Sequence, residues 1–303
     1  LHLSIRRQRQ MCIRDREYVT VKNPYFEDME SYFGLIDGGQ TAVIEMASCA
    51  GLPLVEDRKD PRLTTTYGVG QLILAAAGKG VKKIIVGLGG SSTNDGGCGA
   101  AAAAGIRFYD RGGREFIPTG GTTADIDRID LSGRDSLLEQ VEIVTMCDID
   151  NPMYGPAGAS FIFGPQKGAD EAMVLQLDEG IRNLSRAIAQ ATGTDISQVP
   201  GTGAAGAMGA GMIAFFGSRL QMGIQTVLDT VKFDEIIGDA DYILTGEGKL
   251  DSQSLRGKVV IGIAKRANKQ AKAVIAVVGG ADDDEIGKAY DMGCLLYTSD
   301  AAD

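Results

Sequence analysis

The sequence lacks tryptophan altogether and contains a single histidine, His2, among 303 residues. His2 belongs to a terminal segment without helical or strand periodicity, so we place it outside the fold. A Ser-His-Asp triad and a histidine general base are then excluded. Any proton transfer must use an aspartate, a glutamate or a lysine instead.

The sequence also lacks Cys-x-x-Cys pairs, P-loop motifs, and long apolar or basic runs. The five cysteines are widely spaced with no Cys-x-x-Cys pair, which excludes a disulfide framework and a zinc site and favours a cytoplasmic location. No Gly-x4-Gly-Lys-Ser/Thr motif occurs, and no apolar run has membrane-spanning length. With a net charge of −10 and no long basic run within the fold, we expect neither nucleic acid nor a membrane as a partner.

The chain does contain 42 glycines, placed between periodic segments as many tight turns require. Residues 17–63 hold three β-rich runs separated by turn residues, which predict a β-meander. Residues 64–294 alternate strands with helices, which predicts an α/β fold with a mostly parallel sheet and flanking helices. Here we expect a hairpin around residues 111–113, a short strand at 159–163 and a helix at 170–192.

The two ends differ in composition from the rest of the chain. Residues 1–16 are rich in arginine, residues 295–303 carry no motif, and neither segment shows periodicity. We predict that both lie outside the fold and add nothing to its stability, either as sequence foreign to the gene or as disordered tails.

The most informative segment joins a predicted buried strand at 81–86 to a predicted helix at 98–104, and it is rich in glycine and hydroxyl groups. Ligands of open α/β sheets bind at the carboxyl ends of strands, and free N–H groups at a helix N-terminus suit a phosphate. A plain helix cap is the alternative. The expected phosphate-binding residues are Gly89, Gly90, Ser91, Ser92, Thr93 and Asn94.

One carboxylate, Asp95, stands in this segment. A carboxylate beside a phosphate indicates a base or a metal ligand. We expect Asp95 to stay ionised and to orient an attacking hydroxyl or hold the metal. Asn is nearly isosteric, so we expect Asp95→Asn to keep the fold and to lower turnover about a hundredfold or more.

Acidic residues also follow the predicted strand at 141–147. Asp148 and Asp150 lie two residues apart, so both carboxylates can face one hard cation such as Mg²⁺. The alternative is a capped turn. The loop 246–251 follows the strand at 242–245 and holds Glu247, Lys249 and Asp251.

For the 246–251 loop we predict that Lys249 contacts a transferring phosphoryl group, with Glu247 in a catalytic role and Asp251 on the metal. A solvated turn is the alternative. The carboxyl ends of parallel strands meet at one edge of a sheet, so we expect the acidic loops at 87–97, 148–152 and 246–251 to gather in one place.

A second glycine-rich segment, Gly201, Gly203 and Gly206, has the spacing of a dinucleotide-binding motif. No strand is predicted before it, so the context that an NAD fold requires is missing. Nucleotide phosphates remain one hypothesis for these glycines, and close helix packing is the other.

Taken together, the segments at 41–47, 63–68, 89–97, 147–152, 163–169, 201–211 and 244–254 resemble the glycerate kinase family in type and in order. The resemblance covers residues 17–294. It implies ATP-dependent, magnesium-assisted phosphorylation of D-glycerate, giving 2-phosphoglycerate. It also implies two α/β domains, a discontinuous flavodoxin-like part and a mixed domain that includes the β-meander, with the site between them.

The chain departs from the family pattern at both ends. The family's Asp-Ser-Phe-Lys-Gly and Asp-Gly-Gly-Glu-Gly loops are absent, and the family continues beyond Cys294. We therefore interpret the chain as an internal fragment of doubtful activity, in which the meander continues a missing portion. An oligomer is compatible with the sequence. The alternatives are a small-molecule kinase of the sugar or mevalonate type and a non-catalytic α/β ligand-binding protein.

Overall fold

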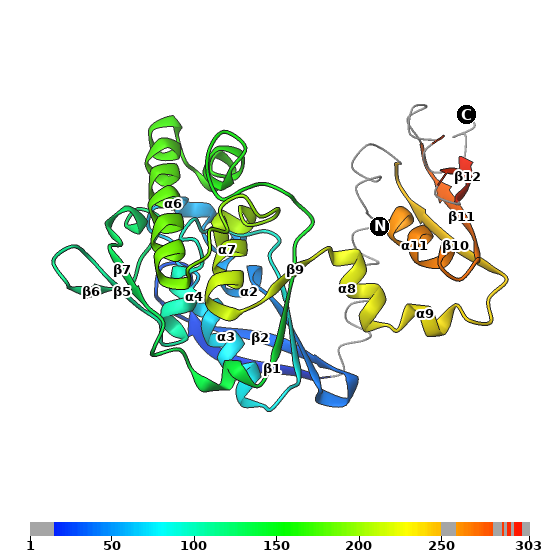
Figure 1. Cartoon of the computed structure of the whole chain (residues 1–303), viewed down its shortest axis with the longest axis horizontal. Coiled ribbons are helices and arrows are strands. Elements are labelled where there is room, and N and C mark those ends of the chain that lie inside the picture. Colours follow the sequence, from blue (N-terminus) through cyan, green and yellow to red (C-terminus); the bar gives the residue numbers. More distant parts are fainter. Residues whose placement is uncertain (1–14, 250–258, 281–286, 288–289, 292–293, 299–303) are drawn as a thin grey trace. The chain divides into compact units, whose positions relative to one another are not determined.

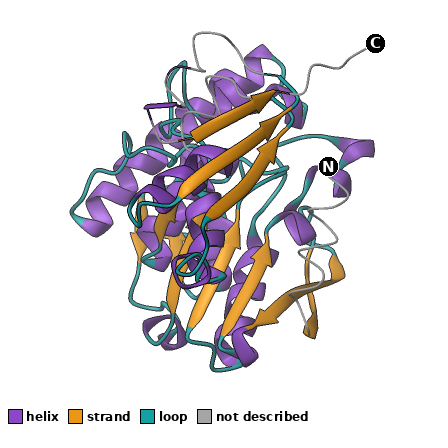
Figure 2. Cartoon of the chain, turned by 90° about the vertical axis from the view of Figure 1, so that its right-hand side faces the viewer, coloured by secondary structure: helices purple, strands orange, loops and turns teal. Residues whose placement is uncertain are grey.

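The computed structural model describes residues 15–249, 259–280, 287, 290–291 and 294–298. The chain divides into two compact units, Leu1–Gln221 and Met222–Asp303 (Figure 1). Helices flank the strands of each unit (Figure 2).

The first unit is built on a six-stranded sheet with the order β1-β2-β3-β4-β8-β9. Its first three strands pair antiparallel, which confirms the predicted meander, and β3, β4, β8 and β9 pair parallel. Gly87 at the end of β4 lies opposite Glu45 and Met146, so the carboxyl ends of three strands are level. The strands are β1 (Asp15–Lys22), β2 (Asp28–Ile36), β3 (Thr41–Glu45), β4 (Lys83–Gly87), β8 (Glu142–Met146) and β9 (Arg219–Gln221).

Apolar helices cover this sheet. Helix α3 packs on β1–β4 and on α4, and α7 packs on β8 and β9. The longest helix, α6, buries Val174, Leu177, Ile181 and Ile188 at the predicted helical spacing, and the Asp170 side chain caps its first turn. The helices are α2 (Ala47–Ala50), α3 (Tyr67–Gly78), α4 (Cys98–Ala103), α5 (Ala159–Phe163), α6 (Glu171–Thr192) and α7 (Ala204–Phe216).

A small antiparallel sheet of the first unit, with the order β6-β5-β7, contains the predicted hairpin. Phe108 of β5 packs edge-on against Phe215 of α7, with ring centroids 5.8 Å apart, and both rings are buried. The strands are β5 (Arg107–Tyr109), β6 (Glu115–Phe116) and β7 (Arg128–Asp130), and short 3-10 turns are η1 (Asp37–Gly39), η2 (Leu52–Leu54), η3 (Glu56–Arg58), η4 (Thr123–Asp125), η5 (Ser136–Glu139) and η6 (Pro165–Lys167).

The second unit has a separate parallel sheet with the order β10-β11-β12. Val260, Ile261 and Ala264 of α11 and Val274 of β11 form its core. The elements are α8 (Gly223–Thr230), α9 (Phe233–Ile236), β10 (Tyr242–Glu247), α11 (Val259–Asn268), β11 (Ala273–Val278) and β12 (Cys294–Thr298).

Two predicted features of local structure are wrong. Residues 159–163 form helix α5 instead of a strand, and the amides of Ile162 and Gly164 donate to the carbonyls of Gly158 and Ser160, four residues earlier. The prediction failed because an apolar run this short is compatible with either a helix or a strand. The ends also enter the fold. Asp15 pairs with Leu35, and Leu295 in β12 pairs with Ile275, since a strand at a sheet edge is held by its neighbour without any periodicity of its own.

The predicted organisation of the loops also needs correction. Strands β4 and β8 lie in one sheet, whereas β10 and β11 lie in another, so the acidic loops after them do not share one sheet edge. The boundary expected between residues 63 and 64 falls inside one compact unit, because β3 pairs with β4. None of the helices in the described residues is long and apolar enough to cross a membrane.

Candidate functional site

The loop 88–97 leaves the carboxyl end of β4 and enters α4, as the sequence predicts. Gly89 and Gly90 are exposed, and Gly90 has a φ of +74°, a left-handed conformation that favours glycine. The next five residues, 91–95, are all buried. A ligand at this loop therefore meets the two glycines first.

Asp95 is fully buried, with none of its surface exposed. Its Oδ2 accepts hydrogen bonds from the Thr66 amide at 2.8 Å, the Thr66 hydroxyl at 2.9 Å and the Gly99 amide at 3.1 Å. Its Oδ1 accepts from the Gly97 amide at 3.1 Å. Burial raises the pKa of this carboxyl, and the four donors oppose that rise.

The free N–H groups that the sequence predicts at this helix start are not there. Helix α4 has only six residues, and Asp95 itself takes the amides of Gly97 and Gly99. The Thr66 hydroxyl, held by Asp95, accepts from the Ala100 amide at 2.9 Å. The protein's own carboxylate thus occupies the place that a phosphate would need.

The buried hydroxyl and amide groups of the loop fasten it to neighbouring segments. Ser92 Oγ donates to the Ala50 carbonyl at 3.0 Å, and Asn94 Nδ2 donates to Ser160 Oγ of α5 at 3.1 Å. Ser91 forms an isolated β-bridge with Gly51. Thr93 Oγ1 and Asn94 Oδ1 are buried and have no partner among the residues that the structure describes.

Lys167, which the sequence analysis left unassigned, lies at the same loop. Its side chain is 1% exposed, and Nζ donates to the Thr93 carbonyl at 2.6 Å. Burial lowers the pKa of Lys167 to about 7, against the opposing charge of Asp95. In the sequence, Lys167 stands between Gly164 and Gly168. This pattern is equally typical of a buried lysine and of a lysine in an exposed turn.

The three glycines of the second motif have a packing role. All are buried, and a Cβ at Gly206 would overlap the Thr93 carbonyl oxygen, while one at Gly203 would overlap the Pro152 carbonyl oxygen. Gly201 lies against the Cys147 sulfur. The structure therefore shows close packing at these three glycines, which is the second hypothesis. As predicted, no strand directly precedes this segment.

The start of α7 is strained. Ala205, Gly206 and Ala207 all have positive φ, at 55°, 68° and 65°, which makes one left-handed turn. This turn lies between two loops of the site, since the Gly96 amide donates to the Gly206 carbonyl and the Gly203 amide to the Asn151 carbonyl. An alanine in this conformation costs about 1–2 kcal/mol.

Replacing Ala205 by glycine should relieve this strain. Because glycine also costs about 0.5–1 kcal/mol of backbone entropy, we expect a net gain near 0.5–1 kcal/mol, or about 1–4 °C in Tm. Ala189, equally half-buried but in the regular helix α6, is the matched control, and Ala189→Gly should lower Tm. Differential scanning calorimetry decides, and a lower Tm for both variants would show that position 205 carries no strain.

The loop after β8 carries the predicted metal ligands. Asp148 and Asp150 are both exposed, directly after the strand. Asn151 Nδ2 donates to the Ala157 carbonyl at 2.8 Å and closes this loop. Within the described part of the chain, no group of three Asp, Glu, His or Cys side chains is arranged to hold a metal, and Asp251 lies outside those residues.

The remaining predicted residues lie in the second unit. Glu247 ends β10 and is half-buried, its carbonyl accepting from the Gly279 amide at 3.3 Å, and Lys249 is exposed. These two residues belong to the separate parallel sheet, so the structure does not join them to Asp95 or Asp148 through one sheet edge.

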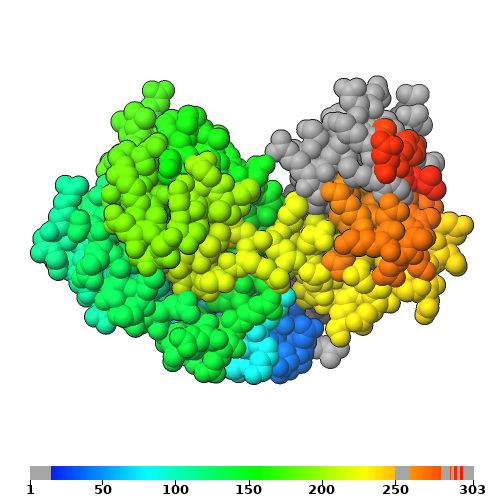
Figure 3. All heavy atoms as spheres, in the orientation of Figure 1, coloured from blue at the N-terminus to red at the C-terminus, as the bar shows by residue number. Residues whose placement is uncertain are grey.

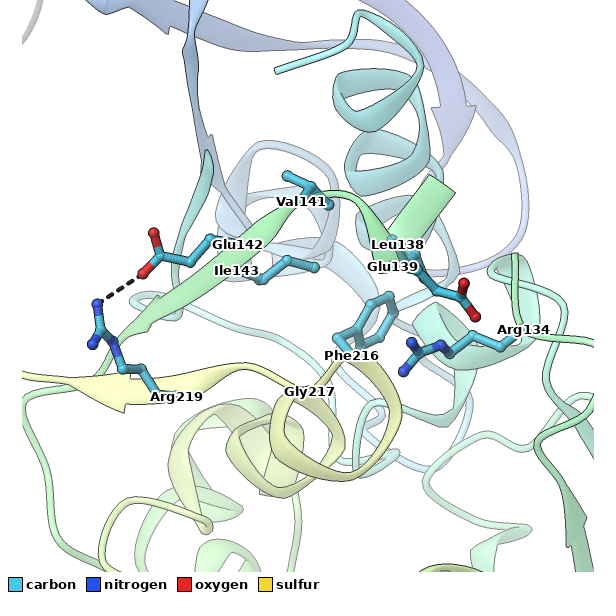
Figure 4. A pocket seen from close by; sticks show the side chains of 9 residues that line it. All are labelled: Arg134, Leu138, Glu139, Val141, Glu142, Ile143, Phe216, Gly217 and Arg219. Carbon is cyan, nitrogen blue, oxygen red and sulfur yellow. Dashed lines mark hydrogen bonds and ion pairs between the residues drawn. The ribbon is translucent and has the colours of Figure 1, made fainter. Parts of the chain in front are cut away.

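A surface pocket of about 450 Å³ lies elsewhere in the first unit, lined by Arg134, Glu142, Phe216 and Arg219 among others (Figure 4). Arg219 pairs with Glu142 at 2.8 Å across its rim. Glu142 begins β8, whereas Asp148 follows its end, so the pocket is at the opposite end of the strand from the site. In the space-filling view, light green residues of the α6–α7 region form part of the visible face of this unit (Figure 3).

Comparison with known proteins gives consistent matches. The glycerate kinase family matches residues 8–300. A glycerate kinase of Halalkalibacterium halodurans is 41% identical over 91% of this chain and 72% of its own length, and the glycerate 2-kinase of Escherichia coli is 44% identical over 87% and 70%. A crystal structure assigned as glycerate kinase 2 from Salmonella typhimurium superposes with a TM-score of 0.81 at 37% identity, covering 94% of this chain and 75% of that one.

Proposed function

This chain belongs to the glycerate kinase family, and on that premise we propose that it transfers the γ-phosphoryl group of ATP to a hydroxyl of D-glycerate. The observation that carries the proposal is the family match over residues 8–300, nearly the whole chain. The same match favours a glycerate kinase over a kinase of the sugar or mevalonate type and over a non-catalytic ligand-binding protein. The name of the E. coli relative, a glycerate 2-kinase, supports 2-phosphoglycerate as the product.

Magnesium fits the residues after β8. Mg²⁺ in phosphoryl-transfer sites is held by one or two carboxylates together with substrate phosphates, and Asp148 and Asp150 are exposed carboxylates two residues apart. When bound, the ion would neutralise charge that develops on the phosphates. We assign Asp148 and Asp150 to it, with Asp251 as a further candidate.

Of the other residues, we assign some to direct contact with the substrates and one to positioning the loop. We assign the exposed backbone of Gly89 and Gly90 to the nucleotide phosphates, and Lys249 and Glu247 to the reacting groups. Phosphoryl transfer depends chiefly on positioning and charge neutralisation. Asp95 is buried, so we give it a positioning role for the 88–97 loop in place of direct contact with glycerate. The four cysteines within the described residues are free thiols, which fits a reducing compartment, and we propose the cytoplasm.

The test is the reaction itself. The purified chain is incubated with ATP, MgCl₂ and D-glycerate, and ³¹P NMR distinguishes phosphate on C2 from phosphate on C3. We expect glycerate-dependent ADP with an equal amount of 2-phosphoglycerate, and none after EDTA. The E. coli relative serves as the positive control.

Three outcomes are informative. A chain that is folded by circular dichroism and makes no glycerate-dependent ADP contradicts the proposed activity. Formation of 3-phosphoglycerate contradicts only the product. Activity that survives EDTA contradicts only the role of the metal.

A further inference from the structure

Lys167 is buried at a place where burying a charge is costly. Its side chain is 1% exposed, and its one recorded hydrogen bond runs from Nζ to the Thr93 carbonyl at 2.6 Å. An ammonium group in the protein interior needs a compensating charge or hydrogen bonds. The local chain is shaped to bring it there, since Gly168 has a φ of +97° and its Cα lies against the backbone of Lys59.

Asp95 lies two residues after Thr93 in the same loop, and its charge opposes the lowering of the Lys167 pKa by burial. The other titratable groups near this point contribute no further buried charge: the Cys98 thiol has its pKa raised by burial, and Lys59 and Asp170 are exposed. Segments 159–163 and 204–207 contain no titratable side chain.

The Thr93–Asn94 peptide is held from several directions. Lys167 of η6 bonds the Thr93 carbonyl, and Asn94 bonds Ser160 of α5. Gly206 packs against the Thr93 carbonyl oxygen so closely that a Cβ would not fit. Of these contacts, only the one from Lys167 brings a charge.

We propose that Lys167 is a positioning residue: its buried Nζ, bonded to the Thr93 carbonyl, sets the conformation of loop 88–97. The inference deepens the proposed function, because this loop presents Gly89 and Gly90 to the nucleotide phosphates in that proposal. Lys167 is buried, so we expect it to act on the substrates only through the loop. Its loss should therefore lower kcat and raise KM for ATP, while KM for glycerate stays nearly unchanged.

The first experiment follows the loop without any substrate. The amides of Ser92 and Gly96 donate to the carbonyls of Ala50 and Gly206, so their hydrogen exchange reports on loop order. In Lys167→Met we expect exchange of both amides to accelerate about tenfold or more. Lys82→Met, at an exposed lysine of the same unit, is the control and should leave exchange unchanged.

The second experiment separates a charged from a neutral contact. Lys167→Gln keeps an N–H donor without the charge, and we expect its exchange rates to lie between those of the wild type and Lys167→Met. This variant also preserves the test if Lys167→Met does not fold. In a glycerate-phosphorylation assay we expect kcat of Lys167→Met to fall about tenfold to a hundredfold, the range for a displaced site.

The third measurement uses pH. Burial holds the pKa of Lys167 at about 7, while the unfolded chain keeps that proton to about pH 10. The unfolded state therefore binds more protons between these pH values, and this lysine makes wild-type stability rise with pH. We expect the stability of the wild type relative to Lys167→Met to increase from pH 7 to pH 9.5.

Unchanged amide exchange in Lys167→Met overturns the inference whatever the kinase assay shows. A rise in KM for glycerate alone, with kcat and KM for ATP unchanged, also overturns it, because the loop is assigned to the nucleotide. If the wild type shows no activity, the proposed function fails, and the exchange comparison still decides the role of Lys167.

Discussion

Replacing Asp95 by asparagine is expected to destabilise the first unit by about 1–3 kcal/mol, the range for leaving a buried hydrogen-bond donor without its acceptor. All four recorded contacts of the carboxylate are donors, from Thr66, Gly97 and Gly99. An asparagine amide can accept on one side only, so its NH₂ group would face a donor. The substitution also removes the charge that opposes the lowering of the Lys167 pKa.

Urea denaturation followed by circular dichroism measures this loss. Asp127→Asn is the matched control, because Asp127 is exposed in the same unit, and it should change stability by less than about 0.5 kcal/mol. If Asp95→Asn folds, we expect its turnover to fall about a hundredfold through displacement of the loop. An unfolding midpoint equal to that of Asp127→Asn would contradict the account of Asp95.

This prediction differs from the one drawn from the sequence, in which asparagine is nearly isosteric and the fold survives. Asparagine has the shape of aspartate, but it replaces one hydrogen-bond acceptor by a donor. The sequence does not show that Asp95 needs acceptors on both sides, because one of its donors, Thr66, lies 29 residues earlier in the chain.

Replacing Gly206 by alanine is expected to cost about 2–5 kcal/mol, because two penalties act together. The φ of +68° is unfavourable for alanine by about 1–2 kcal/mol. In addition, the Cβ would overlap the Thr93 carbonyl oxygen and the Asn94 Cα, and forced overpacking costs about 1–3 kcal/mol. Both overlapping atoms are backbone, so a side-chain rotation cannot relieve them.

Gly193→Ala is the control that separates the two penalties. Gly193 ends α6 with a φ of +74°, and a Cβ there has no neighbouring atom within 4 Å. It should show only the conformational cost of about 1–2 kcal/mol. Thermal and urea denaturation of both variants give the comparison. Equal losses at the two positions would show that Gly206 is not in tight contact with the 88–97 loop.

Local patterns predicted several elements well. Helix α6 follows from buried apolar residues at helical spacing, and the β1–β3 meander follows from β-rich runs between turns. The place of loop 88–97, between β4 and α4, follows in the same way. In each case the residue pattern that predicts the element extends over many residues of one continuous segment.

Features that depend on a distant partner were not predictable. The strand β12 is held by β11, and α5 is too short for its period to distinguish helix from strand. The burial of Lys167 depends on Thr93, which lies 74 residues away in the chain. The left-handed turn at 205–207 contains two alanines, which by themselves favour a right-handed helix.

The sequence by itself determined the family, the α/β class and the segments that carry polar side chains, because motif order and apolar periodicity are properties of the chain. Tertiary structure alone decided what those side chains do. Asp95 accepts hydrogen bonds from Thr66, Gly97 and Gly99, Lys167 donates to the Thr93 carbonyl, and Gly201, Gly203 and Gly206 pack closely against neighbouring segments. The physical reason is that burial, hydrogen-bond polarity and charge compensation are set by atoms brought together from distant segments.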